Sequence, residues 1–214
     1  VMVLQLDQEN TLEVVAQGGG HIQVMRHDGT LLWETSAGVQ YSYPVAMDAD
    51  LNGFMDIVLF ENAGFRILDG RTGALLESYN VASTGWRPGL ALDLDADGIT
   101  DLVGAASGKM SIVLRDGAGG AKAIHQIAPP EGSYFSGDVP AAADLDGDGD
   151  AEVLVGTAYS TCNDANAEPC LGLMLAYNSD GTLAADPATQ FVVPDAGNAY
   201  SGGPNPSIAD ADGD

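Results

Sequence analysis

Positively charged side chains are scarce in this chain. Its 214 residues include 7 Lys and Arg against 31 Asp and Glu, which gives a formal net charge of −24. Nucleic-acid binding requires a basic surface that neutralises phosphates, so this composition predicts no nucleic-acid partner. Long apolar runs are missing as well, and without about 20 consecutive apolar residues we expect no membrane insertion.

Cysteine is also rare, with only Cys162 and Cys170, both in the segment STCNDANAEPCLG. A disulfide between them would close a small loop, as is typical of proteins in an oxidising compartment, whereas two free thiols are the alternative. We expect the disulfide. It would place the protein outside the cell or at the cell surface, with the periplasm as a further option.

The sequence lacks the period of an amphipathic helix. Its apolar residues come instead in short runs rich in β-branched residues, such as DIVLFE, DLVGAA and EVLVGT. Runs of this kind, bounded by turn residues, predict β-strands. The 45% of hydrophobic residues is enough for a folded core, so we expect an ordered all-β protein.

Aspartate is abundant, and much of it follows one repeated pattern, D-x-[DN]-x-[DN]-G-x-x-[DE], before an apolar run. Three complete copies carry Asp48, Asp50, Asn52 and Asp56; then Asp93, Asp95, Asp97 and Asp101; then Asp144, Asp146, Asp148 and Glu152, with Asp150 as an added carboxylate. The stretch DADGD begins a further copy with Asp210, Asp212 and Asp214. A decayed copy, QLDQENTLEVV, starts at Gln5 and has no glycine, so we expect it to bind metal weakly or not at all.

Four carboxylates in one short loop repel each other unless a cation lies between them. Calcium takes six to eight oxygen ligands, and alternate residues of a tight loop can direct their carboxylates to one centre. In the second copy Gly98 would permit the bend and Ile99 would supply a backbone carbonyl. An acidic turn without metal is the alternative. We expect about three calcium sites and an incomplete fourth at the C-terminal end.

The flanking residues exclude an EF-hand, whose calcium loop begins with the same D-x-D-x-D-G pattern. An EF-hand has a bidentate Glu at position twelve and a helix on each side. Position twelve is occupied here by Leu59, Gly104 or Val155, and the flanks have the pattern of strands. The predicted calcium loop therefore joins two β-strands.

The loops begin at residues 5, 48, 93, 144 and 210, a spacing that suits a four-stranded unit. Such units close radially into a β-propeller, with a β-sandwich or a solenoid as the alternative. We expect four blades and the first strand of a fifth, as part of a ring of seven or eight. The predicted blades are residues 1–40, 41–83, 84–131, 132–197 and 198–214, and the fourth has its outer strand near TLAA.

The three complete copies, DADLNGFMDIVLF, DLDADGITDLVGA and DLDGDGDAEVLVG, resemble the FG-GAP or VCBS repeat. This repeat occurs in the head of integrin α subunits and in many bacterial secreted proteins. The resemblance covers nearly the whole chain. It implies that each loop joins the first and second strands of a blade and carries calcium on the lower face of the propeller.

Aromatic residues recur before the expected inner strands, in QYSYP, TGWRP, GSYFSGDVP and NAYSGGPNP. They are Tyr41, Tyr43, Trp86, Tyr134, Phe135 and Tyr200. Either each ring packs between neighbouring blades, or the rings form a shared platform for a protein or glycan ligand.

No catalytic motif stands out. His21, His27 and His125 form no recognisable ligand set, the lysines and arginines are scattered, and most clustered carboxylates are assigned to metal. We predict a non-enzymatic, calcium-binding extracellular propeller for adhesion, ligand binding or structural scaffolding. The alternative is a propeller domain of a secreted polysaccharide-active enzyme of the lyase type.

Overall fold

The computed structural model describes residues 1–37 except 8 and 10, and residues 43–81, 89–106, 108–135, 139–159, 171–184 and 190–194. Within these ranges the chain contains strands and turns, and no helix. The same ranges accordingly hold no helix that is long and apolar enough to cross a membrane.

Three successive four-stranded antiparallel sheets have their strands in chain order. The first sheet contains β1 (Met2–Leu4), β2 (Glu13–Gly18), β3 (His21–Met25) and β4 (Leu31–Ser36). The second contains β5 (Val45–Met47), β6 (Asp56–Glu61), β7 (Gly64–Leu68) and β8 (Leu75–Tyr79). The third contains β9 (Leu90–Leu92), β10 (Asp101–Ala106), β11 (Lys109–Arg115) and β12 (Ala121–Ile127).

The fourth sheet differs from the other three because it has five strands. They are β13 (Ser133–Phe135), β14 (Ala141–Ala143), β15 (Glu152–Tyr159), β16 (Leu171–Tyr177) and β17 (Gln190–Pro194). Both β13 and β14 pair with β15, so the aromatic stretch predicted as a connector is partly a strand. The outer strand predicted near TLAA is also wrong. Leu183 forms only an isolated bridge to Tyr177, and β17 takes the outer place.

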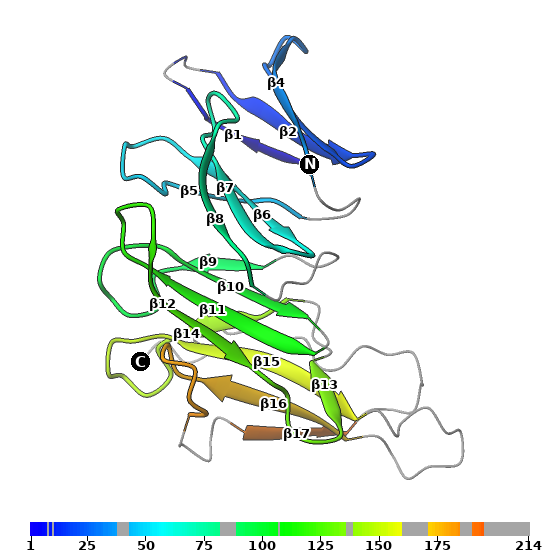
Figure 1. The fold of residues 1–214 in the computed structure, drawn as a ribbon, viewed down its shortest axis with the longest axis vertical. Helices are drawn as coiled ribbons and strands as arrows, with labels where there is room; N and C mark the ends of the chain where they lie inside the picture. The colour runs from blue at the N-terminus through cyan, green and yellow to red at the C-terminus, as the bar shows by residue number, and fades with distance from the viewer. Residues whose placement is uncertain are drawn as a thin grey trace, which may run out of the picture.

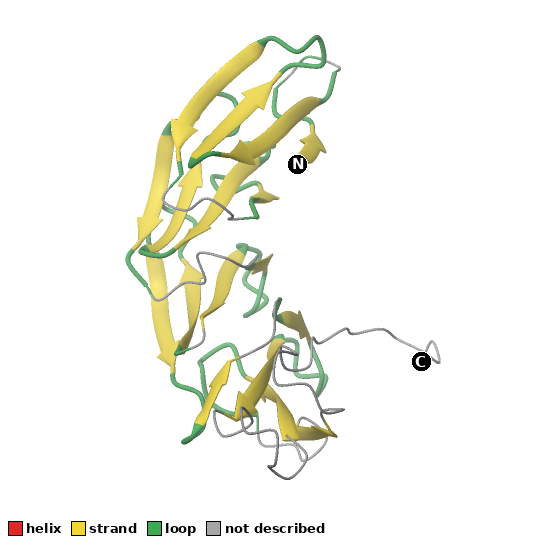
Figure 2. Cartoon of the chain, turned by 90° about the vertical axis from the view of Figure 1, so that its right-hand side faces the viewer, coloured by secondary structure: helices red, strands yellow, loops and turns green. Residues whose placement is uncertain are grey.

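The sheets follow one another along an arc, with the short strands β1, β5, β9 and β14 on its inner side (Figures 1 and 2). This arrangement confirms the predicted all-β propeller class with four-stranded antiparallel blades. The number of blades in the ring stays a prediction. The expected first strand of a fifth blade lies outside the described residues.

The hydrophobic core lies between consecutive sheets, which explains the unbroken apolar run of β6. Ile57 and Leu59 pack in a cluster with the first sheet, whereas Val58 and Phe60 pack in a cluster with Leu102 of the third. Alternate residues of a strand point to opposite faces, so a strand covered on both faces has consecutive apolar residues, here residues 57–60 between the buried carboxylates Asp56 and Glu61. All six residues of β6 are buried.

The second and third sheets approach closely at Gly104 in β10. A Cβ atom at this position would lie 2.7 Å from the ring of Phe65, which is itself 1% exposed. Phe65 is held in turn by an edge-to-face contact with Phe60, whose ring centroid is 5.0 Å away. The packing of these two sheets therefore requires glycine at position 104.

We predict that Gly104→Ala lowers the free energy of unfolding by about 1–3 kcal/mol, because the added methyl group overpacks the contact between the sheets. Gly18→Ala is the matched control, since a Cβ at residue 18 meets nothing within 4 Å. Urea-induced unfolding measures both. Equal losses in the two variants would contradict the close approach.

Candidate metal centres

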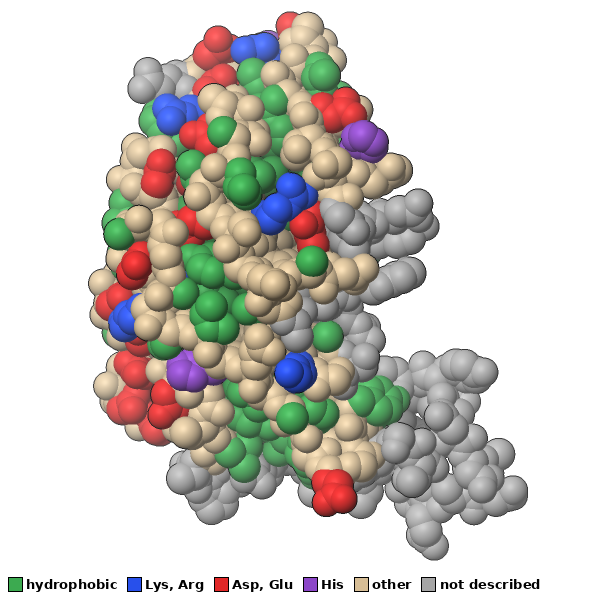
Figure 3. Space-filling view, in the orientation of Figure 1, with side chains coloured by type: hydrophobic (Ala, Val, Ile, Leu, Met, Phe, Trp, Pro, Cys, Tyr) green, Lys and Arg blue, Asp and Glu red, His purple; other side chains and the backbone are tan. Residues whose placement is uncertain are grey.

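The three complete acidic loops occupy equivalent places in their sheets. They connect β5 to β6, β9 to β10 and β14 to β15, which are the first-to-second strand connections of the propeller pattern. All three lie along one edge of the molecule, at the left of Figure 1. Acidic side chains line the same edge of the surface in Figure 3. The fold thus collects the clustered aspartates on one face.

Each loop brings three carboxylates together. One oxygen from each member of a group lies within 4.8 Å of the others, and the groups are Asp48, Asp50 and Asp56; Asp93, Asp95 and Asp101; and Asp144, Asp146 and Glu152. The members stand at the first, third and ninth positions of the pattern in every case. The same three positions of the pattern therefore come together in every complete loop.

Backbone hydrogen bonds shape each loop around its first carboxylate. Gly53 N donates to Asp48 Oδ2 at 2.8 Å, and Gly98 N donates to Asp93 Oδ2 at 2.9 Å. Both glycines have a positive φ, of 87° and 85°, which explains the glycine at the sixth position. The glycine and its hydrogen bond to the first carboxylate therefore produce the bend of the loop, and this bend brings the carboxylates together.

The ninth-position carboxylate is buried in every complete loop. Asp56 and Asp101 are each 1% exposed, and Glu152 is 2% exposed. An oxygen of each accepts a hydrogen bond from the backbone N–H of the second loop residue, over 3.0, 2.9 and 2.7 Å respectively. Burial raises the pKa of Asp56 and of Asp101 to about 6, against the opposing effect of these hydrogen bonds. Burial also raises the pKa of Glu152.

The donor set fits a hard divalent cation. Asp95 Oδ1 is buried and has no hydrogen-bond partner, although an ionised oxygen in that state is costly. A cation within the group of Asp93, Asp95 and Asp101 would give this oxygen a partner. Oxygen atoms from carboxylates and carbonyls are the ligands that calcium prefers.

The other predicted metal ligands have local partners in the loops. The side-chain oxygens of Asn52, Asp97 and Asp148 each accept a hydrogen bond from the backbone N–H two residues later, at 2.8 to 2.9 Å. One of these donors is Ile99 N, whereas ligation by the Ile99 carbonyl stays a prediction. Asp150 Oδ2 accepts a hydrogen bond from Ser179 Oγ at 3.1 Å. Asp210, Asp212 and Asp214 lie outside the described residues.

The decayed first loop keeps one element of the arrangement. Glu13 is fully buried, and its Oε2 accepts a hydrogen bond from Leu6 N at 2.8 Å, as the ninth-position carboxylates do in the other loops. Within the described part of the chain, no group of three carboxylates forms there. The hydrogen bond between the buried ninth-position carboxylate and the start of the loop can therefore form without a complete set of metal ligands.

The predicted aromatic platform is only partly available. Tyr43 is 60% exposed and Tyr134 is 36% exposed, whereas Phe135 is 2% exposed and packs edge-to-face on Tyr177 with ring centroids 6.4 Å apart. For Phe135 the platform hypothesis is wrong, because the ring belongs to the core between the third and fourth sheets. Three of the predicted aromatic residues and both cysteines lie outside the described ranges: Tyr41, Trp86, Tyr200, Cys162 and Cys170.

Two basic residues whose positions look scattered in the sequence contact the acidic loops. The Lys122 ammonium bonds to Asp97 Oδ2 at 3.0 Å and to Asp95 Oδ2. Arg115 is 1% exposed and donates to both carboxylate oxygens of Glu77. Arg115 ends β11 and Lys122 lies in β12, so the two residues stand on either side of the turn of residues 116–120, and only this placement could have indicated the contacts.

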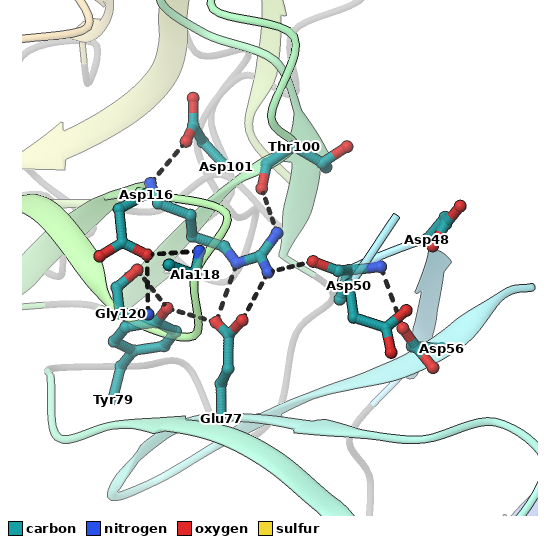
Figure 4. Close-up of polar contacts among 12 residues, drawn as sticks. Asp48, Asp50, Asp56, Glu77, Tyr79, Thr100, Asp101, Asp116, Ala118 and Gly120 are labelled. Carbon is teal, nitrogen blue, oxygen red and sulfur yellow. Dashed lines mark hydrogen bonds and ion pairs between the residues drawn. The ribbon is translucent and has the colours of Figure 1, made fainter. Parts of the chain in front are cut away.

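Arg115 connects two neighbouring loops, and its partners Glu77, Thr100 and Asp101 are labelled in Figure 4. Its Nη2 donates to the Ala49 carbonyl of the first complete loop at 2.6 Å, and its Nη1 donates to the Thr100 carbonyl of the second at 2.9 Å. Its backbone N–H donates to Asp101 Oδ1 at 2.8 Å. The Arg115–Glu77 pair thus joins the second and third sheets, and Arg115 bonds to the loops of two candidate metal centres.

We predict that a carbon-13 NMR titration of the metal-free protein gives a pKa of about 6 for both Asp56 and Asp101. Asp28 is an internal reference, because hydrogen bonds from Thr30 lower its pKa. Since the two raised values lie above the unfolded value of about 3.9, these groups favour folding most at acidic pH. Their contribution falls as the pH rises through about 6. Midpoints at the ordinary aspartate value would contradict their burial.

Residues 93–155 match the family model for the FG-GAP-like repeat. This segment includes the second and third complete acidic loops. A search of curated proteins finds no match.

Solved structures show the fold over most of the chain. The chain is similar to the Vibrio cholerae biofilm matrix protein Bap1 (18% identity, TM-score 0.50), covering 95% of this chain and 40% of that one. It is similar to the exotype rhamnogalacturonan lyase YesX (16%, TM-score 0.55), covering 85% and 39%. It is also similar to an Agrocybe aegerita lectin with specific recognition of non-reducing terminal N-acetylglucosamine (16%, TM-score 0.50), covering 86% and 50%.

The chain spans about 40–50% of the length of these solved chains. At such identities the likeness concerns the fold alone, and that fold agrees with the stacked four-stranded sheets described above. The family match confirms the resemblance to the FG-GAP-like repeat for residues 93–155, and for the rest of the chain that resemblance stays a prediction.

Proposed function

We propose that this chain is a calcium-binding β-propeller module of an extracellular protein, with a role in adhesion, ligand binding or structural scaffolding. The observation that carries the proposal is the triple recurrence of one ligand geometry. Three loops, each at the same place in its sheet, bring together carboxylates from the same three positions.

Charge and burial explain why a cation would matter to this fold. Each group places a buried carboxylate beside two others, and the neighbouring acids Asp95 and Asp97 contribute to raising the pKa of Asp101. Bound calcium would supply positive charge among these oxygens. A metal that binds the folded loop better than the unfolded chain stabilises the fold by mass action.

The face opposite the loops is the candidate surface for a partner. Tyr43 precedes β5, whose other end leads into the loop at Asp48, so this exposed ring lies at the far end of the inner strand. Tyr134 is also partly exposed, in β13. Because Bap1 is a biofilm matrix protein and the Agrocybe aegerita lectin recognises a sugar, we propose a glycan or matrix protein as the partner.

A second candidate function is that of a propeller domain in a polysaccharide lyase. It is favoured by the structural likeness to the rhamnogalacturonan lyase YesX. A general base could be sought at His21, whose Nδ1 lies 2.9 Å from Glu34 Oε1 beside a shallow hollow that Gln23 also lines. We favour the non-catalytic module, because both side chains of this pair are substantially exposed.

We predict that calcium raises the melting temperature of the metal-stripped protein and that excess chelator reverses the gain. At a concentration of about 100 times Kd, one site adds about 2.7 kcal/mol to the free energy of unfolding. Asp146→Asn should remove or weaken one of the sites in a calorimetric titration. Asp7→Asn is the matched control, since Asp7 holds the third position of the decayed loop and accepts a similar local hydrogen bond from Glu9.

The control variant should bind as much calcium as the unchanged chain. A melt that calcium and chelator leave unaltered would contradict the proposal. Equal loss of binding in Asp7→Asn and Asp146→Asn would contradict the prediction that the decayed loop binds calcium more weakly than the complete loops.

The two candidate functions differ in their effect on acidic polysaccharides. We predict that the calcium-loaded chain binds immobilised glycans or matrix protein without releasing unsaturated sugar ends, which ultraviolet absorbance detects. Release of such ends, and its loss in His21→Ala, would favour the lyase candidate instead.

A further inference from the structure

A lysine ammonium lies on the ligands of the second complete loop. Lys122 Nζ is 3.0 Å from Asp97 Oδ2 and also bonds to Asp95 Oδ2, so it contacts the third and fifth positions of the pattern. The Lys122 side chain is 45% exposed, whereas that of Asp95 is 11% exposed. The ammonium therefore reaches the acidic group from the solvent side.

A β-bulge places Lys122 there. In the third sheet Leu114 pairs with Ala123 and Arg115 pairs with Ala121, so Lys122 is the extra residue between two paired positions. A bulge changes the direction of the strand and of its side chains. Here it lies directly after the turn of residues 116–120, and Lys122 reaches the loop between β9 and β10 from this position.

The first two sheets have the same bulge with a different residue. In the second sheet Ile67 pairs with Glu77 and Leu68 pairs with Leu75, which leaves Leu76 as the extra residue. In the first sheet the corresponding residue is Leu32, between Leu31 and Trp33. The repeat thus carries leucine twice and lysine once at this position.

The loop of residues 48–56 also has a basic neighbour, but the contact is of another kind. The Arg71 guanidinium lies 4.8 Å from the centroid of the Phe54 ring and pairs with Asp69 at 3.4 Å. Asp69 is not one of the three grouped carboxylates of that loop. Arg71 therefore does not take the place that Lys122 takes on the next loop.

We propose that Lys122 lowers the calcium affinity of the loop of residues 93–101. Its ammonium already neutralises part of the negative charge that would otherwise attract calcium. The inference rests on the calcium binding proposed above. Before Asp95 and Asp97 can turn to the metal, they must release Lys122 or share their oxygens with it, and like charges repel. This loop is accordingly a weaker calcium site than the loop of residues 48–56.

In the metal-free protein the same contact is stabilising. Lys122 neutralises part of the negative charge of the loop, so it stabilises the metal-free fold. Its long side chain is partly exposed and can move into solvent when calcium binds. Lys122 therefore reduces the difference in stability between the metal-free and the calcium-bound protein.

The test is a site-resolved calcium titration of the metal-stripped chain by NMR. The amide signals of Gly53, Gly98 and Gly149, at the sixth position of the three loops, report each site separately. In Lys122→Met the midpoint of Gly98 should move to a calcium concentration about threefold to thirtyfold lower, as expected for the loss of one or two partly exposed ion pairs. The midpoints of Gly53 and Gly149 should stay unchanged.

Two further variants make the assignment specific. Leu76→Lys places a lysine on the equivalent bulge of the second sheet and should move the Gly53 midpoint to higher calcium. Lys109→Met is the matched control, since Lys109 Nζ bonds to Gln126 at 3.3 Å and is the first residue of β11, at the opposite end of the strand from Arg115. It should leave all three midpoints unchanged.

The metal-free melting temperature is the second readout, and it should fall in Lys122→Met. An unchanged Gly98 midpoint in Lys122→Met, while calcium still shifts all three signals, would overturn the role of Lys122 and leave the proposed function intact. If calcium shifts none of the three signals in the unchanged chain, the proposed function itself fails.

Discussion

A buried carboxylate at the start of the second strand is the constraint on which the loops depend. In the first complete loop, one oxygen of Asp56 accepts a hydrogen bond from Ala49 N and the other accepts one from Gly70 N. In the second, Asp101 makes the equivalent bonds to Leu94 N and Arg115 N. Each carboxylate thus ties the start of its loop to the end of the third strand.

This tie has an electrostatic cost. A carboxylate inside the protein is less well solvated than in water, and its pKa rises accordingly. A cation held by the neighbouring carboxylates would offset the cost, which links the architecture of the blade to the proposed metal. The decayed loop keeps one of these two bonds, from Leu6 N to Glu13 Oε2, whereas Glu13 Oε1 is buried without a hydrogen-bond partner.

The loops also take part in the contact between sheets. Arg115 bonds to Glu77 of the second sheet and to carbonyls of two loops, and Trp33 Nε1 donates to the Gly70 carbonyl at 2.8 Å across the first interface. Because two of these bonds end on carbonyls of loop residues, Ala49 and Thr100, ordering of a loop affects the packing between the second and third sheets. A metal at one edge of the propeller can thereby stabilise more than its own hairpin.

Local sequence pattern was sufficient to predict the loops, the strands beside them and the propeller class. The alternation of aspartates and the glycine at the sixth position have their cause within the loop itself. The five-stranded fourth sheet and the contacts of Lys122 and Arg115 were not predicted, and the sequence left open whether Phe135 packs between blades or belongs to a ligand platform. These features depend on strand register and on packing between sheets, which residues far apart in the chain decide together.

The most direct measurement is anomalous diffraction from crystals grown with calcium. The account predicts anomalous peaks in the three complete loops, with carboxylate oxygens of the first, third and ninth positions at about 2.3–2.6 Å from each ion. Loops that contain only water under these conditions would contradict it.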